Sequence, residues 1–283
     1  RGTTTAGSIN TALGSNRADK EGNSNGVLSS FDSNGFTVAG GSSSSNPRAL
    51  VNKGTTADDY VAWCWKAGGS GSSISVDSIS SGVPSIASTV SASTESGFSL
   101  VKWTATGSVG TVAHGLSQKP EMIIYKSIDV SGVNWIIGHA GNPNGFSDRL
   151  QFTNGAVSSN NSDAFNSTEP TNQVMTIGSF SNTNNKDHIA YVFHSVDGFS
   201  KFGHYIGKGT IGDTFVFTGF RPAFVMIKSN DSSTNWSIFD NARNLFNEAD
   251  EVLEADESIA RSTNSNGPDL LSNGFRVRGN VGN

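Results

Sequence analysis

The most constraining feature of this sequence is an internal repeat, in which short blocks return in the same order. The block GLSQKPEMIIYKSIDVSGVNWII begins at Gly115, and its counterpart GFRPAFVMIKSNDSSTNWSIF begins at Gly219. Within these blocks Trp135 and Trp236 lie 101 residues apart. A block that returns at such a period marks a structural unit copied along the chain. We therefore expect tandem units with one common fold.

Two further blocks agree with this arrangement. The tripeptide GFS occurs at Gly97 and Gly198, which are again 101 residues apart. A block containing Asn-Gly occurs three times, as FDSNGFTV around Asn34, FTNGAV around Asn154 and LLSNGFRV around Asn273. Asn-Gly favours the backbone angles of tight hairpins, so these blocks predict strand-turn-strand elements.

The offsets between blocks predict the domain organisation. YVAWCW from Tyr60 aligns with HIAYVF from His188, with a longer offset of 128 residues. This difference indicates an insertion at 66–96, whose Ser/Gly-rich start is typical of a linker that then enters a strand. We predict a partial first β-sandwich repeat, a second repeat and a partial third repeat, together forming about two sandwich domains. Their predicted boundaries are 1–107, 108–211 and 212–283.

The two outer copies are incomplete within this sequence. The first copy lacks the P-x-x-V-M-I-K…N-W block, and the third stops at Asn283 before its counterpart of YVAWCW. A sheet without those strands has open edges, which proteins normally cover. We expect the missing strands to come from a longer chain or from neighbouring subunits.

Short segments rich in β-branched and aromatic residues, separated by glycine-containing turns, predict an all-β protein. Only Asn244–Arg261 has a helical aspect, and we interpret it as one short helix or an acidic loop. The predicted strands are SLVKWT from Ser99, MIIYK from Met122, AYVF from Ala190, TFVFT from Thr214 and AFVMIK from Ala223.

Composition excludes several partners. Only 15% of the residues are charged and the formal net charge is −5, with no basic run. This gives no electrostatic footprint for nucleic acid. No apolar stretch approaches the length of a membrane span, so we expect no membrane insertion. The single cysteine, Cys64, cannot form an internal disulfide.

Several blocks in combination resemble a repeat family in structural proteins of marine tailed bacteriophages. They are SNGF, DDYVAWCWKAGG, AHGLSQKPEMIIYK, NW, YVFHSVDGFSKFGHY and TGFRPAFVMIK, and the resemblance extends from about Ser29 to Val277. It implies tandem jelly-roll or concanavalin-like (lectin-like) β-sandwich units. It also implies a virion location, in a tail or tail fibre, with other copies of the chain and other virion proteins as partners. The resemblance supplies no catalytic residues.

The search for catalytic chemistry favours a non-enzymatic protein. The sequence has no G-x-S-x-G, no H-E-x-x-H and no cysteine pairs at zinc spacing. We therefore predict no catalytic residues, no metal and no cofactor. Three alternatives remain open: a capsid-surface or decoration protein, a secreted adhesin, and a polysaccharide depolymerase. The last of these needs two carboxylates facing each other in a cleft.

A repeated set of residues predicts a ligand site. Each copy places an acid, an amide and an indole close together, a combination that sugar sites use to fix hydroxyls and to cover C–H groups. A host-surface glycan is the expected ligand. The alternative is that the indoles fill the core while the polar groups fix a turn, as a repeated fold requires. We also interpret Trp63 and Trp65 as core residues on one face of a strand. The six candidate residues are Asp129, Asn134, Trp135, Asp231, Asn235 and Trp236.

Overall fold

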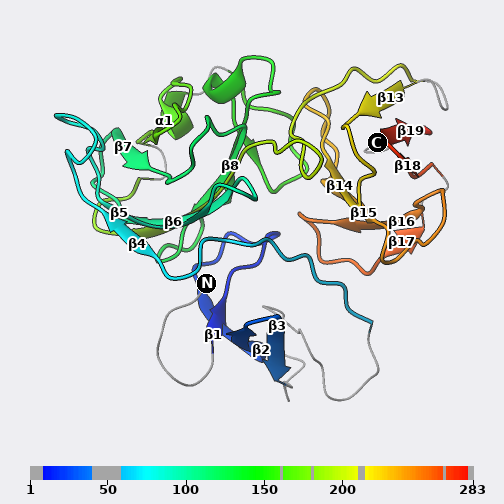
Figure 1. Ribbon diagram of the computed structural model, residues 1–283, viewed down its shortest axis with the longest axis horizontal. Helices are drawn as coiled ribbons and strands as arrows, with labels where there is room; N and C mark the ends of the chain where they lie inside the picture. The colour runs from blue at the N-terminus through cyan, green and yellow to red at the C-terminus, as the bar shows by residue number, and fades with distance from the viewer. Residues whose placement is uncertain are drawn as a thin grey trace.

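A computed structural model describes residues 9–39, 59–159, 162–179, 182–209, 214–263 and 266–279. It shows two β-rich bodies side by side, with a small N-terminal sheet below them (Figure 1). The helices of the described residues are one turn each, α1 (Ser162–Phe165) and the 3₁₀ helix η1 (Gly145–Ser147). The prediction of an all-β, sandwich-type fold is confirmed. None of these helices has the length and apolar character needed to cross a membrane.

The central body is built on a seven-stranded antiparallel sheet, in the order β10-β9-β8-β12-β6-β5-β4. A two-stranded sheet of β7 (Gly110–Ala113) and β11 (Val174–Ile177), together with η1 and α1, covers one face. The bounds of the larger sheet are β4 Ser72–Ile74, β5 Ser88–Ser93, β6 Phe98–Thr104, β8 Met122–Ser127, β9 Ile136–His139, β10 Leu150–Gln151 and β12 Asp187–Phe193.

The central position of β8 follows from its sequence. Every residue of MIIYKS is buried, which a strand needs when both of its faces are covered. Ile123 and Tyr125 point into the core beneath β7 and β11, whereas Met122 and Ile124 join a second cluster on the opposite face. The continuous apolar run therefore serves two cores at once.

The C-terminal body contains a four-stranded sheet, β14-β15-β16-β17, and a three-stranded sheet, β13-β19-β18. A third cluster of apolar residues fills the space between them. The bounds are β13 Thr214–Phe217, β14 Phe224–Ile227, β15 Ser237–Asp240, β16 Glu251–Glu254, β17 Ser262–Thr263, β18 Asp269–Leu271 and β19 Gly274–Val277.

The N-terminal sheet, which we call the arm, consists of β1 (Ile9–Ala12), β2 (Gly22–Asp32) and β3 (Gly35–Ala39). Its β2–β3 hairpin and the β18–β19 hairpin both close with two residues between the paired positions, as the repeated Ser-Asn-Gly sequence predicts. Asn154 differs, because it lies in an irregular segment after β10 and forms no hairpin.

Two expectations need correction. Asn244–Arg261 contains strand β16 and turns and no helix. Its apolar Val252 faces the third core cluster, so tertiary packing favours an extended conformation there. The Ser/Gly-rich start of 66–96 is more than a linker, because it supplies β4 to the central sheet, and the strand expected after it is β5.

The sequence repeats and the packed bodies also have different limits. Strand β6 lies in the predicted first repeat, 1–107, yet it pairs with β12 of the second along its whole length. Residues 1–8 and 40–58 of the first repeat lie outside the described residues. Sheet membership is decided by hydrogen bonding, which does not follow the boundaries of copied sequence.

Candidate functional site

The structure separates the six predicted ligand residues into two groups, one at each repeat. Asp129 and Asp231 are exposed, and Asn134 and Asn235 are half-buried. The indoles of Trp135 and Trp236 are buried, each with 4% of its surface exposed. The acids and the indoles of each repeat therefore lie in different environments.

The two indoles meet in the second core cluster, where the central and C-terminal bodies join. The Phe152 ring lies between them, with centroid distances of 6.2 Å to Trp135 and 5.2 Å to Trp236. Each indole N–H donates a 2.8 Å hydrogen bond to a backbone carbonyl, of Gly14 and Gln151 respectively. In this arrangement the rings act as core, and neither offers an open face to a sugar.

Two of the four polar members of the set, Asp129 and Asn235, hydrogen-bond to the protein. The Asp129 carboxylate accepts a 2.8 Å hydrogen bond from the backbone N–H of Asp187, at the start of β12. The Asn235 amide donates a 2.7 Å bond to the Glu254 carboxylate of β16. These contacts correspond to the turn-fixing alternative considered from the sequence.

The structure adds a pair of lysines to these loops. The ammonium group of Lys126 donates to the carbonyl of Val133, and that of Lys228 donates to the carbonyls of Ser229 (2.8 Å) and Ser232 (3.2 Å). Burial lowers the pKa of Lys126 to about 8 and also lowers the pKa of Lys228. The sequence shows this pair as a lysine at the end of each of two counterpart apolar runs, MIIYK and AFVMIK.

The sequence predicts that Trp63 and Trp65 are core residues, but Trp63 is half-buried and Trp65 is exposed. They lie in an extended segment, 59–67, that is not part of a described strand, and Trp65 is 46% exposed. Both indoles contact the ring of Phe224 on β14, at centroid distances of 5.5 and 5.7 Å. Trp65 also lies 6.2 Å from Phe193 of β12, so these rings bridge the two bodies.

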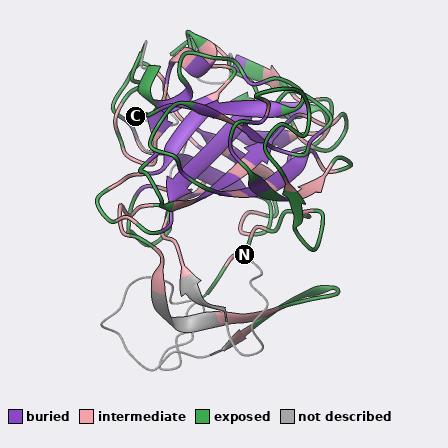
Figure 2. Cartoon of the chain, turned by 90° about the vertical axis from the view of Figure 1, so that its left-hand side faces the viewer, coloured by how far each residue is buried: buried purple, intermediate pink, exposed green. Residues whose placement is uncertain are grey.

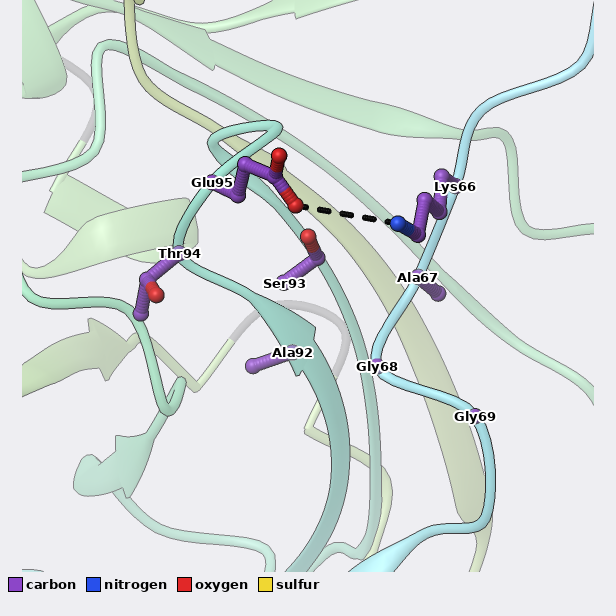
Figure 3. A pocket seen from close by; sticks show the side chains of 8 residues that line it. All are labelled: Lys66, Ala67, Gly68, Gly69, Ala92, Ser93, Thr94 and Glu95. Atoms are coloured by element: carbon purple, nitrogen blue, oxygen red, sulfur yellow. Dashed lines mark ion pairs between the residues drawn. The ribbon is translucent and has the colours of Figure 1, made fainter.

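A groove of about 510 Å³ follows this segment (Figure 3). One wall is the chain from Lys66 to Gly69, and the other is the end of β5 with the turn that follows, from Ala92 to Glu95. Lys66 and Glu95 face each other across it at 3.6 Å, and both side chains are largely exposed. The groove is shallow and open, and both polar and apolar groups line it.

The buried titratable groups have structural partners. The His114 imidazole accepts the N–H of Leu116 and contacts the carbonyl of Thr171, and burial lowers its pKa to about 4. Each of the four buried carboxylates in the described residues hydrogen-bonds to the protein, to the partners Asn144, Arg243, the Trp236 N–H and Arg278. No group of three or more metal-ligating side chains occurs in the described part of the chain.

The arm carries an exposed aromatic pair. Phe31 and Phe36 are directly opposite each other at the end of the β2–β3 hairpin, with 57% and 41% of their surfaces exposed. Figure 2 shows the buried residues concentrated in the body, with the hairpin outside it. The two rings form an exposed aromatic pair on one face of the hairpin.

Fold and geometry together define an all-β protein of packed sandwich units with an aromatic junction. The chain matches, over residues 4–283, the family described as Domain of unknown function (DUF7483), and it belongs to that family. Neither the curated proteins nor the solved structures include a match to this chain.

Proposed function

We propose that this protein is a non-enzymatic structural component of a bacteriophage particle, in the tail or a tail fibre. The resemblance of its repeated blocks to those of phage structural proteins supports a location in the virion. The arm supports a role in assembly. An arm that ends in the exposed Phe31–Phe36 pair suits a contact with a second copy of the chain.

The free edge of the arm supports the same role. Strand β3 is the last strand of its sheet, whereas its repeat counterpart β19 lies between β13 and β18. Among the described residues, the outer edge of β3 has no strand partner, whereas β19 has one on each side. Strand addition at such an edge gives affinity through backbone hydrogen bonds, while neighbouring rings give specificity.

Loop 13–21 joins the arm to the body. The carbonyl of Ala18 accepts a 2.9 Å hydrogen bond from the N–H of Gly132, and the N–H of Glu21 donates a 2.9 Å bond to the carbonyl of Ile128. The arm is thus fixed at its base while its tip is exposed, as a subunit contact requires.

Sedimentation of the purified chain tests the assembly role. We expect the wild type to form oligomers and a protein carrying F31S and F36S together to sediment as a monomer with an unchanged circular dichroism spectrum. F217S is the matched control, because Phe217 is 65% exposed but lies on β13 of the body. A monomeric wild type, or equal loss of oligomers with F217S, contradicts the role of the arm.

Location is tested separately on native particles. Antibodies against the chain, detected with gold, should label tails or fibres. Label distributed over the head supports the decoration-protein alternative. Release of reducing ends from host polysaccharide supports the depolymerase alternative.

A contact with host-surface glycan is a second candidate function, favoured by the groove. Its volume lies in the range of ligand sites, and Ser93 and Thr94 line it with hydroxyls. Titration calorimetry with host polysaccharide should show binding that a protein carrying K66A and E95A together loses. These side chains are 76% and 87% exposed, so the double change leaves the fold intact. Equal binding by both proteins contradicts a site in the groove.

A further inference from the structure

One edge of the C-terminal sheet has no described partner. Strand β14 is the last strand in its sheet and pairs only with β15. Its repeat counterpart β8 is flanked on both sides, by β9 and by β12. The residues that correspond to β12 in the third repeat are not among 214–279. An unpaired strand edge in the interior of a sheet protein calls for a covering segment.

The repeat identifies a segment with the right sequence. YVAWCW, from Tyr60, is the first-repeat counterpart of the β12 sequence HIAYVF. In the central sheet, Phe193 of β12 is opposite Met122 of β8. The block alignment that matches Pro120 with Pro222 makes Phe224 the counterpart of Met122. If the segment behaves as β12 does, Trp65 should lie beside Phe224.

The structure places the Trp65 ring against that of Phe224. Its ring centroid lies 5.7 Å from that of Phe224, and the Trp63 ring, two residues earlier, lies 5.5 Å from the same ring. In antiparallel strands, a residue contacts both its direct partner and the diagonal one on the same face. One direct and one diagonal contact is therefore the pattern that pairing with β14 predicts.

We propose that Tyr60–Trp65 is the edge strand of the C-terminal sheet and binds antiparallel to β14 of the same chain. The register places Trp65 opposite Phe224, Cys64 opposite Val225 and Trp63 opposite Met226. In the structure, the rings of Trp63 and Trp65 make the contact with Phe224. The proposed pairing adds hydrogen bonds between the backbones of the segment and β14. The first repeat then supplies the strand beside β14.

This closure has a chemical consequence at Cys64, which is exposed in the structure. Side chains alternate across a strand, so the paired segment turns Cys64 to the face that Val225 occupies. Val225 belongs to the third core cluster and is 7% exposed. The proposal concerns closure within one chain and does not depend on the assembly role of the arm.

Disulfide trapping tests the register, because Cys64 is the only cysteine of the chain. In V225C, oxidation with diamide removes one hydrogen from each thiol and reduces the diamide to its hydrazine. Non-reducing electrophoresis and peptide mass mapping then locate the disulfide. We expect an intramolecular bond to Cys64 in V225C that forms at least tenfold faster than in V252C.

V252C is the matched control, since Val252 is also a valine of the third core cluster and is 6% exposed. It lies on β16, two strands from β14. Equal rates in the two variants, or no disulfide in V225C, would overturn the proposal. Disulfide-linked dimers would overturn it as well, since they assign the edge to a second copy.

Hydrogen exchange on the unaltered protein keeps the test valid if V225C fails to fold. Pairing on both edges should give all amides of β14 protection within tenfold of those in β8. An open edge instead leaves alternate β14 amides exchanging at least 100-fold faster than their β8 counterparts. That result would contradict the edge strand.

Discussion

Strands β9 of the central body and β15 of the C-terminal body carry counterpart sequences, and their clearest difference in the core is a glycine against a phenylalanine. Gly138 on β9 corresponds to Phe239 on β15. A Cβ atom at Gly138 would lie 2.6 Å from ring atoms of both Phe146 and Phe165, which come from η1 and α1. Phe239 is fully buried and fills the equivalent space from its own strand.

This difference shows that the space at one core position can be filled from different elements in the two copies. The central body has two short helices over its sheet, and their rings occupy the space above Gly138. The described part of the C-terminal body has no helix, so the strand itself must supply the ring. A repeated sequence can therefore keep its strands while the loops between them determine how the core is filled.

Removal of the Phe239 ring should have the largest effect. F239A deletes a fully buried ring with no neighbouring helix to replace it, so we expect a loss of about 3–5 kcal/mol in the free energy of unfolding, measured by urea denaturation. F217A, at an exposed phenylalanine, should stay within about 0.5 kcal/mol of the wild type. A loss below about 1 kcal/mol in F239A would show that other side chains collapse into the space.

The two bodies should differ in their sensitivity to acid. The central body contains His114, whose repeat counterpart is Thr218. Burial lowers the pKa of His114 from 6.5 to about 4, so between these pH values the unfolded chain binds more protons than the folded one. Stability should therefore fall by about 3 kcal/mol as the pH drops from 6.5 to 4. In H114Q this part of the fall should vanish, whereas H204Q, at an exposed histidine, should retain it. An unchanged pH profile in H114Q would contradict the assignment.

Lys126 and Lys228 should contribute differently to the change in stability at alkaline pH. Because burial lowers the pKa of Lys126 from 10.5 to about 8, the folded chain loses this proton before the unfolded chain does. Stability should rise as the pH increases from 8 to 10.5, by at most about 3 kcal/mol. K126M should flatten this rise more than K228M, and K201M, at an exposed lysine, serves as the control. A rise that survives in K126M would assign it to another group.

A methyl group at Gly138 should give the smallest effect of the four. G138A forces the Phe146 and Phe165 rings apart, and overpacking of this kind costs about 1–3 kcal/mol. G203A is the control, since a Cβ atom there has no neighbour within 4 Å. Thermal unfolding of both variants measures the difference. Equal unfolding midpoints in G138A and G203A would mean that η1 and α1 shift enough to accommodate the added methyl group.

The sequence predicted those parts of the fold that depend on local patterns. The apolar runs predicted the strands MIIYK and AYVF. The three Asn-Gly blocks predicted three hairpins, and the two that read Ser-Asn-Gly form them. The short helix considered for 244–261 does not form. Its acidic residues resemble the exposed face of a helix, while contacts from distant strands hold Val252 in an extended conformation. The candidate ligand set in each repeat stays a prediction, and the structure buries the indole of each set. Its residue types suit both a sugar and a turn, and only burial distinguishes them.

The sequence by itself determined the repeat, the strand class and the equivalence of positions such as Trp135 and Trp236. These follow from side-chain periodicity and turn chemistry, which act over a few residues. The tertiary structure alone decided that the two indoles share one aromatic cluster through Phe152 and that Trp65 lies against Phe224. The two indoles are 101 positions apart, and Trp65 and Phe224 are 159 apart. Contacts between such distant residues form only where packing brings the surfaces of different strands together.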